Sequence, residues 1–549
     1  MIIIGSGITG LMATYFACEK GVKVKLITKN NYNFNGYQWS ESGGCSWKTH
    51  AFNVASQRND STEMHYTDTM EGSSFLANPT LARTLCEKAP EIISFLESIG
   101  LKIERDETGN IATKPFGGCG VPRAVHIEDR LGYHITSALN NKLTKFIKNG
   151  LLEILSQRRI ISLEKEEKIY KLYVQNVTTN EMKLIKSTTV IFADGGGASM
   201  YYPSAVTLDK TCDGIALALK LGIDLVDMEF VQFHPTGLIS KNPKFNGTLF
   251  EESLRFAGAK LFNVHEERFL FNYEELGEQA TRDKVSRAIY MEIQKGNGFK
   301  NGGVKLDFHD CYNILMSEYP ALLERLKQAG YNPQKEKHVY IKPTAHFMMG
   351  GVKINEKCET SKEGLYYAGE SAGGVHGANR LGGNGLTEAL VFGKIAGERA
   401  AEYERIHGTL YDELHMDPFS MLDNGTENLI DNMESFKKEM YNNAGIVRKT
   451  EDLNYMLHKI EEYRNKKYKV NTFNSVFLSQ LYLDFSNQLM VSESIIKSAL
   501  QREESRGSHY RVDFNTSSHK NSNNFVKMIE SELYVNNIVR EETRYLQEV

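Results

Sequence analysis

The chain has 549 residues, which is long enough for two to four domains with sizeable hydrophobic cores. Its 65 basic and 69 acidic side chains give a net charge of −4, so the composition excludes a protein that binds nucleic acid through a general basic surface. No apolar run has membrane-spanning length, and no signal peptide is expected because the first predicted strand begins at Met1.

Seven cysteines are scattered along the chain, and no two of them form a CxxC pair. A dispersed, odd set favours reduced thiols in the cytoplasm over a disulfide framework. It also argues against an iron–sulfur cluster within the chain, because such clusters are held by grouped cysteines. We therefore expect a cytoplasmic protein without a metal site of its own, whose electrons pass to another protein or a small molecule.

The first ten residues, MIIIGSGITG, predict a strand, a glycine turn and a helix. In this unit Gly5 makes the turn, Gly7 lets a pyrophosphate approach, and Gly10 lets the helix pack on the strand. A second predicted strand ends at the usual distance, but Thr28 and Lys29 stand where an acid normally binds the ribose hydroxyls. The unit predicts dinucleotide binding and leaves the ribose contact open.

Further along, predicted strands and helices alternate with glycine-bearing loops. Three segments come first: the loop SESGGCSW (40–47), a helix at 80–100 and the loop KPFGGCGVPR (114–123). Residues 188–198, TTVIFADGGGA, predict a buried strand that opens into three glycines. A helix is predicted at 211–222, with Asp213 near its start as its cap.

The texture of the chain then changes twice. Residues 238–342 carry more charge and fewer long apolar strands, which indicates an inserted domain. Residues 363–374 again have the pattern of a predicted strand followed by a glycine-rich turn. From about residue 424 the chain is polar and helical, which predicts a separate domain. Residues 516–524 are rich in Ser and Asn and predict a loop.

Two glycine-rich stretches, AHFMMGG and SAGGVHGANRLGGNGLTE, contain His346, His376 and Arg380. Glycine permits close backbone approach, and histidine and arginine are the donors that proteins aim at carboxylates. Glycine-rich loops with one histidine are also common away from any site, so either stretch alone is weak evidence.

Taken together, ten motifs resemble the flavoprotein subunits of succinate dehydrogenase and fumarate reductase, a family that includes L-aspartate oxidase. The motifs are GSGITG (5–10), SESGG (40–44), FADGGGA (192–198), TCDG (211–214), FHPTG (233–237), TRDKVSRAI (281–289), HFMMGG (346–351), YYAGESAGG (366–374), HGANRLGGN (376–384) and ESRGSHYR (504–511). The resemblance implies an α/β fold with a Rossmann-like FAD-binding domain (1–237 and 343–406), split by an α+β capping domain (238–342). A C-terminal helical domain (424–549) follows.

The resemblance also implies residue roles. In this family hydride passes between flavin N5 and a carbon beside a carboxylate, and Arg282 matches the proton donor or acceptor. Arginine is too basic to exchange protons easily, so a relay is needed, and Glu252 and Arg255 match it. The implied substrate-binding residues are His234, Glu251, His346, Arg380 and Phe116. The implied FAD contacts are Gly5, Gly7, Gly10, Thr28, Lys29, Ser42, Gly43, Gly44, Asp213, Glu370, Asn384 and Leu386.

The chain departs from the family pattern at four places. Glu251 replaces a threonine that helps to bind a substrate carboxylate, and we predict that its pKa lies above the usual value of about 4.3. Tyr37 stands where respiratory members carry the histidine that links FAD covalently, so we expect non-covalent FAD. Phe116 stands where L-aspartate oxidase has a glutamate that meets the amine, and Gly385 alters one flavin contact.

Three functions therefore stay open. The first is a fumarate reductase-like or succinate dehydrogenase-like enzyme acting on a small C4 dicarboxylate. The second is an L-aspartate oxidase-like enzyme, or an enzyme of an amine- or amide-bearing dicarboxylate analogue. The third is a non-catalytic flavoprotein. The expected partners are the small-molecule substrate and, as one candidate, an iron–sulfur subunit, through which any contact with a membrane would be made.

Overall fold

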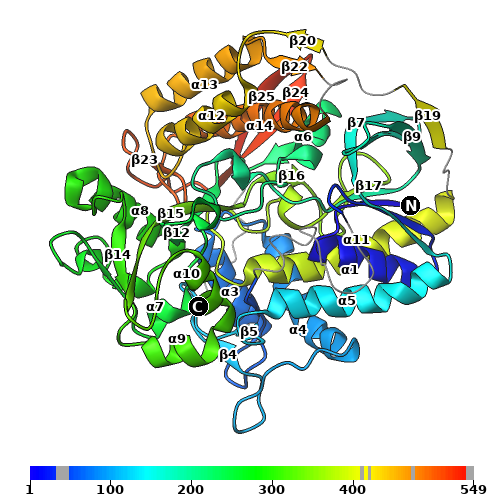
Figure 1. The fold of residues 1–549 in the computed structure, drawn as a ribbon. Helices are drawn as coiled ribbons and strands as arrows, with labels where there is room; N and C mark the ends of the chain where they lie inside the picture. Colours follow the sequence, from blue (N-terminus) through cyan, green and yellow to red (C-terminus); the bar gives the residue numbers. More distant parts are fainter. Residues whose placement is uncertain (32–48, 409–412, 418–421, 472–475, 540–549) are drawn as a thin grey trace.

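The computed structural model describes residues 1–31, 49–408, 413–417, 422–471 and 476–539. Its centre is a parallel sheet in the order β17-β10-β1-β2-β6, and the α/β architecture predicted from the sequence is confirmed (Figure 1). The strands of this sheet are β1 (Ile2–Ile4), β2 (Val24–Ile27), β6 (Leu152–Leu155), β10 (Val190–Phe192) and β17 (Leu365–Tyr367). Because β1 lies between β10 and β2, its carboxyl end opens at the middle of the sheet edge, where α/β proteins bind ligands.

Helices cover this sheet, so β1, β2, β10 and β17 are buried along their whole length, whereas Glu153 of the edge strand β6 is exposed. β1 and β2 are continuous apolar or buried runs, the pattern of strands in a parallel sheet with both faces covered. Helix α1 (Ile8–Glu19) packs between α5 (Leu131–Lys148) and α11 (Asn384–His407), side by side in Figure 1. Residues almost four hundred positions apart thus share one core beside the glycine turn.

Three further sheets and three helices surround the central sheet among the described residues. The sheets are β3-β5-β4 (Ala51–Asn53, Ala124–His126, Thr113–Lys114), β19-β9-β8-β7 (Glu413–Met416, Met182–Ser187, Ile169–Asn176, Arg158–Glu166) and β18-β16-β11-β24-β25 (Ala372–Gly373, Gly351–Lys353, Leu225–Val226, Ser522–Ile529, Glu532–Val539). The helices are α3 (Thr62–Gly72), α4 (Pro79–Ser98) and α6 (Asp213–Lys220).

A second hydrophobic core lies within residues 238–341. Its antiparallel sheet has the order β12-β15-β14-β13 (Val231–Leu238, His338–Met348, Val304–Asp307, Lys260–Phe262). Its helices are α7 (Ser253–Phe256), α8 (Arg282–Glu292), α9 (Tyr312–Glu318) and α10 (Pro320–Gln328). The long strands β12 and β15 leave this layer and run back toward the main body, so their residues lie where the two cores meet.

The C-terminal part contains α12 (Leu429–Asn443), α13 (Thr450–Asn465) and α14 (Val476–Gln501), stacked on one side of the molecule in Figure 1. Two short strand pairs lie among them, β20-β22 (Leu422–Asn424, Lys469–Asn471) and β21-β23 (Val447–Arg448, Tyr510–Arg511). The prediction of a loop over 516–524 was wrong at its end, because β24 begins at Ser522 and pairs with β11. Asn523 and Asn524 are buried there and donate to Asp227 and Glu229, so polar residues that suggest a loop serve a buried strand.

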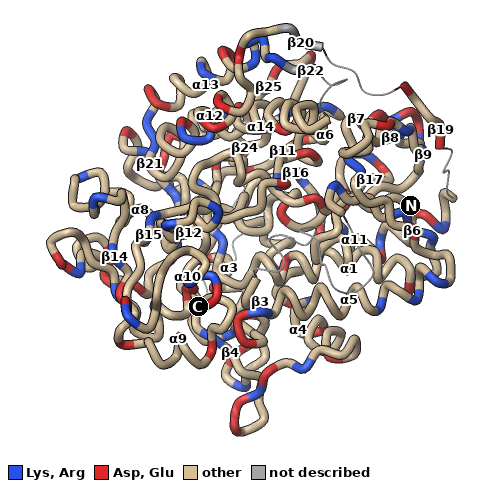
Figure 2. The backbone as a smooth tube through the Cα atoms, viewed as in Figure 1, with Lys and Arg blue, Asp and Glu red and all other residues tan. Residues whose placement is uncertain are grey.

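Basic and acidic residues are interspersed along the described chain (Figure 2). The six cysteines within the described ranges are free thiols. Of the helices in those ranges, none combines the length and the apolar character that crossing a membrane requires.

Candidate active site

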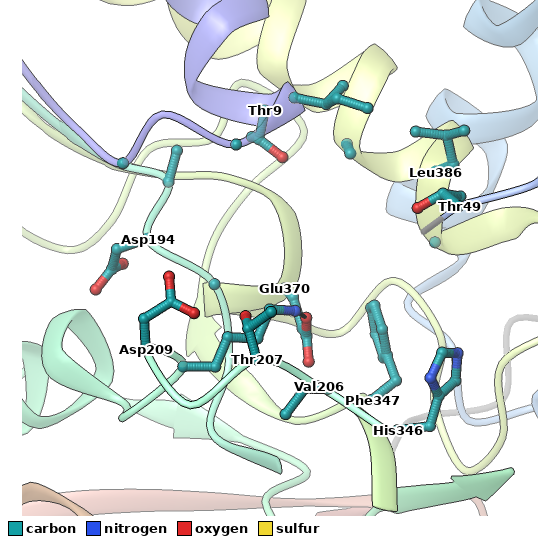
Figure 3. Close-up of a pocket in the computed structure, with 18 of the residues that line it drawn as sticks. Thr9, Thr49, Asp194, Val206, Thr207, Asp209, His346, Phe347, Glu370 and Leu386 are labelled. Atoms are coloured by element: carbon teal, nitrogen blue, oxygen red, sulfur yellow. Dashed lines mark hydrogen bonds and ion pairs between the residues drawn. The ribbon is translucent and has the colours of Figure 1, made fainter. Parts of the chain in front are cut away.

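One continuous cavity joins the glycine turn after β1 to the facing strands β12 and β15. It holds about 2010 Å³ of empty space, open solvent at its mouth included. In Figure 3, Asp194 and Asp209 lie on one side of it and His346 and Thr49 on the other, with Glu370 between them. Predicted cofactor contacts line one end of the cavity, and predicted substrate contacts line the other. This arrangement suits one elongated cofactor with a small substrate beside it.

The cofactor end is formed by backbone. Gly5 has φ +104°, and a Cβ atom there would lie 2.2 Å from the carbonyl oxygen of Ala193. A Cβ atom on Gly10 would lie 1.9 Å from the carbonyl oxygen of Gly5. Both positions therefore require glycine, and Gly7 begins α1 without any side-chain cap. The first residues of α1, Ile8 and Thr9, border the cavity, and the positive end of a helix fits the pyrophosphate of a dinucleotide.

Polar side chains continue this end beyond the turn. Thr28, after β2, shares a hydrogen bond of 2.8 Å with Ser6, and Lys29 donates to Thr211 at 2.8 Å. Glu370 forms an ion pair with Lys210 and accepts from the backbone of Met348 at 3.2 Å. Thr28, Lys29 and Glu370 lie in the cavity wall, as do Gly5 and Gly7, whereas Gly10 does not line the cavity. The predicted contacts Ser42, Gly43 and Gly44 lie outside the described residues.

The prediction that Asp213 caps its helix was wrong. Cys212 is the N-cap residue of α6 and makes no side-chain cap, while Asp213 pairs with Arg159 at 2.6 Å and Lys29 at 3.2 Å. Although burial alone would raise the pKa of Asp213, these two cations hold it below its ordinary value. Asp213 lines the cavity as part of an ion-pair cluster, so its charge is already balanced there.

Asp194 takes over the capping of α6 and was missed by the sequence analysis. It accepts from the backbone N–H of Gly214 at 2.6 Å, while its Oδ1 atom has no hydrogen-bond partner among the described residues. Burial and the nearby Asp213 raise the pKa of Asp194 to about 7. It directly follows strand β10 at the carboxyl edge of the parallel sheet, a position that could have identified it.

Of the two predicted FAD contacts at the start of α11, one lines the cavity and the other lies behind its wall. Leu386 lines the cavity together with Gly383 and Gly385. Asn384 is buried behind that wall, where its side chain bonds Asn53 at 3.0 Å. Asn384 therefore supports the turn and does not itself border the cavity.

At the other end, three charged side chains form a buried chain. Arg282 donates to Glu252 from Nε at 2.6 Å, and Arg255 donates to the other carboxylate oxygen at 3.1 Å. The backbone N–H of Gly117 donates to Glu252 at 3.3 Å as well. Burial alone would raise the pKa of Glu252, but Arg282 and Arg255 outweigh burial and lower it. The arrangement brings together the three residues predicted to move a proton.

Gln232 joins the two arginines that face the cavity and was missed by the sequence analysis. Its Oε1 atom accepts from Arg282 at 3.1 Å and from Arg380 at 2.9 Å. Its amide nitrogen donates to Asn379 and to the carbonyl oxygen of Arg380. Gln232 lies two residues before His234 on β12, and this same-face spacing on a strand was the available signal.

The predicted carboxylate clamp converges on the same place. Arg380 lies over the ring of Phe347 at 4.3 Å, and burial together with Arg282 lowers its pKa to about 9. The rings of His234 and His346 are 5.4 Å apart, and burial and the nearby arginines lower the pKa of both histidines well below the usual range. At neutral pH these histidines are therefore neutral hydrogen-bonding groups, and the arginines carry the positive charge.

Phe116 and Glu251 border the cavity beside this clamp. The prediction of a raised pKa for Glu251 was wrong. Burial alone would raise it, but His50, 2.8 Å away, Arg325, 3.5 Å away, and Lys114 together lower the pKa below its ordinary value. The sequence could not show this, because the cations come from three separate segments.

Comparisons with known proteins agree with this geometry. Residues 1–386 match the FAD binding domain model, and residues 433–540 match the model of the fumarate reductase flavoprotein C-terminus. An uncharacterized FAD-dependent oxidoreductase of Methanocaldococcus jannaschii is 36% identical, with 94% of this chain and 93% of the relative covered. One subunit of the fumarate reductase (CoM/CoB) of Methanothermobacter marburgensis is 34% identical, with 94% of each covered. A solved structure of the FrdA chain of E. coli quinol fumarate reductase has a TM-score of 0.87 at 27% identity, with 98% of this chain and 95% of that chain covered.

Proposed function

Since the chain belongs to the flavoprotein family of fumarate reductase and succinate dehydrogenase, and is an FAD-dependent oxidoreductase, we propose that it interconverts fumarate and succinate. One observation carries this proposal above the others. Arg282 and Arg380, which both line the cavity, share the Oε1 atom of the buried Gln232, so a proton-exchanging arginine stands beside a carboxylate-binding one.

Binding follows from the charge of this end of the cavity. Arg380 offers a planar fork to one carboxylate, and the neutral rings of His234 and His346 add hydrogen bonds without further charge. Three arginines, Arg282, Arg325 and Arg380, outnumber the two acids Glu251 and Glu252 at this end of the wall, so an anion is attracted. Several fixed donors hold the substrate in one orientation. Holding two reactants in a reactive geometry accounts for much of the rate enhancement of a bimolecular step.

FAD, when bound, supplies or accepts the hydride. In fumarate reduction Arg282 gives a proton to the substrate carbon that does not receive the hydride, and in succinate oxidation it removes one. Glu252, which is ionised at rest, takes up a proton from solvent and passes it to Arg282 through the 2.6 Å contact, and Arg255 on its other oxygen favours the return of Glu252 to the ionised form. The direct Arg282–Glu252 contact gives the proton a path of a single hydrogen bond back to the arginine.

The amine-substrate alternative is less well supported by the cavity. Glu251 is the acid that would meet an ammonium group, yet its charge is already balanced by His50 and Arg325. An ammonium group entering there would have to compete with Arg325 and with the imidazole of His50, which both already contact Glu251.

We propose two further features of the working enzyme. FAD is bound without a covalent link, because Tyr37, which lies outside the described residues, replaces the linking histidine. Electrons are exchanged with a separate protein, for which an iron–sulfur subunit is the candidate, since the named relative from Methanothermobacter marburgensis is itself one subunit of its enzyme.

Two assays test the proposal. Reduced viologen with fumarate should give rapid turnover, and L-aspartate with oxygen should give little. The reverse preference would replace the dicarboxylate proposal with the amine-oxidising one. Acid precipitation should release yellow FAD into the supernatant, and colour retained in the pellet would contradict non-covalent binding.

A further inference from the structure

Glu251 and Glu252 are adjacent in the chain and both are buried, but their carboxylates differ in how many hydrogen bonds they accept. Glu252 has both oxygens engaged in hydrogen bonds from two arginines and a backbone N–H. The Oε1 atom of Glu251 lies 2.8 Å from Nε2 of His50 and 3.5 Å from a terminal nitrogen of Arg325, yet has no aligned hydrogen bond among the described residues. Glu252 is therefore fixed in place, whereas Glu251 is held mainly by charge.

The cations around Glu251 come from both cores. His50 precedes β3 of the main body, and Arg325 lies on α10 of the second core. Both side chains line the cavity, and both ring nitrogens of His50 and one terminal nitrogen of Arg325 lack hydrogen-bond partners among the described residues. His50 and Arg325 are partly buried, at 15% and 16% exposure, and the anion that they hold in this structure is the carboxylate of Glu251, so the pair is a place where a carboxylate can bind.

The position suits the second carboxylate of a small dicarboxylate. Glu252, the next residue along the chain, bonds Arg282, so the His50–Arg325 pair lies close to the proton-donating end of the cavity. Lys114 adds positive charge from β4, but Glu318 already pairs with it at 3.3 Å. A substrate carboxylate can take the place of Glu251 on His50 and Arg325 only if the Glu251 side chain turns away, and because its charge stays on the chain, Glu251 opposes dicarboxylate binding.

Resting on the proposed function, we propose that Glu251 is a built-in competitor of the substrate. In the ligand-free cavity its carboxylate occupies the His50–Arg325 pair, and the second carboxylate of the dicarboxylate displaces it on binding. Glu251 thereby lowers the affinity for dicarboxylates and determines which anions bind, because a monocarboxylate held by Arg380 alone has no second group with which to displace it.

The test measures binding to the FAD-loaded enzyme by perturbation of the flavin absorbance. The probes are fumarate, the dead-end dicarboxylate malonate and the monocarboxylate crotonate. Glu251→Gln should lower the Kd of both dicarboxylates about five- to tenfold, the size expected for removing one partly exposed ion pair, and leave crotonate unchanged. Arg325→Gln should raise the dicarboxylate Kd values, and the double variant should resemble Arg325→Gln alone.

Two controls keep this outcome interpretable. Glu318→Gln removes an acid from the same group of cations outside the cavity lining, and it should leave all three Kd values unchanged. Glu251→Thr removes the same carboxylate with a different side chain and carries the test if Glu251→Gln does not fold. Unchanged or weaker dicarboxylate binding in the folded variants would overturn the proposal, as would equal tightening of crotonate.

The experiment also separates this inference from the proposed function. Turnover of fumarate by the unaltered enzyme tests the function, whereas the Kd differences between variants test the competitor. If the unaltered enzyme does not reduce fumarate but the Glu251 variants still bind dicarboxylates with a lower Kd, the proposed function fails and the inference stands. If fumarate is reduced at a normal rate and no Kd changes, the inference fails alone.

Discussion

The two ends of the cavity are built from different material. At the cofactor end, the backbone of a ten-residue segment makes the surface, and Gly5 and Gly10 are required because no Cβ atom fits. At the substrate end, side chains from separated segments meet, and Gln232 holds Arg282 and Arg380 at a common point. The glycine turn at the cofactor end depends on shape and the substrate end on charge, so substitutions at these two places should have different effects.

Arg282→Lys should give the largest effect and should affect the substrate end only. Lysine keeps the charge but loses the planar fork that reaches both Glu252 and Gln232, so turnover should fall by about two to four powers of ten with full FAD content. Steady-state rates and flavin absorbance measure the two quantities. Arg287→Lys on the same helix, whose guanidinium lies over Tyr510, is the matched control and should stay active. Activity within a factor of about three would show that another group moves the proton.

Gln232→Leu should reduce activity less severely. It removes one acceptor that serves two charged donors, and such bonds are worth about 1.5–3 kcal/mol each, so kcat/KM should fall by roughly a hundredfold. Gln232→Glu places a carboxylate between Arg282 and Arg380 and should chiefly raise KM, because it occupies the donors that the substrate needs. Equal effects of both changes on kcat and KM would mean that Gln232 only fills space.

Gly10→Ala tests the cofactor end. Its Cβ atom would lie 1.9 Å from the carbonyl oxygen of Gly5, so helix or turn must shift, at a cost of about 1–3 kcal/mol for overpacking. We expect weaker FAD binding and a lower Tm, with normal activity per bound FAD. Fluorescence of released flavin and thermal unfolding provide the measurements. A variant that keeps its FAD but loses activity would show that the two ends are not independent.

Asp194→Asn should give the smallest effect, and only in a pH window. The folded pKa of Asp194, about 7, is raised above its ordinary value of 3.8, so the folded protein keeps a proton that the unfolded chain releases. Wild-type stability therefore falls as pH rises from about 4 to about 7, and the variant removes that decline. In FAD-free protein the Tm advantage of the variant should grow across this window, by roughly 2 °C. A constant difference would mean that Asp194 does not titrate there.

Much of the molecule follows from local sequence. The strand, glycine turn and helix at residues 1–19 form as their pattern predicts, because backbone sterics and apolar burial act over a few neighbouring residues. Arg282 and Arg380 could also be assigned to the cavity from the motifs around them. The limits of the three predicted domains stay a prediction.

Tertiary structure decided what surrounds each charge. Nothing near Glu251 in the sequence shows that His50, Lys114 and Arg325 converge on it and reverse the expected shift of its pKa. Cys212 took the N-cap position predicted for Asp213, and Asp194, from another strand, took over the capping itself. A fold is specified largely by patterns along the chain, whereas the energy of a buried charge is the sum over whatever the completed fold places around it.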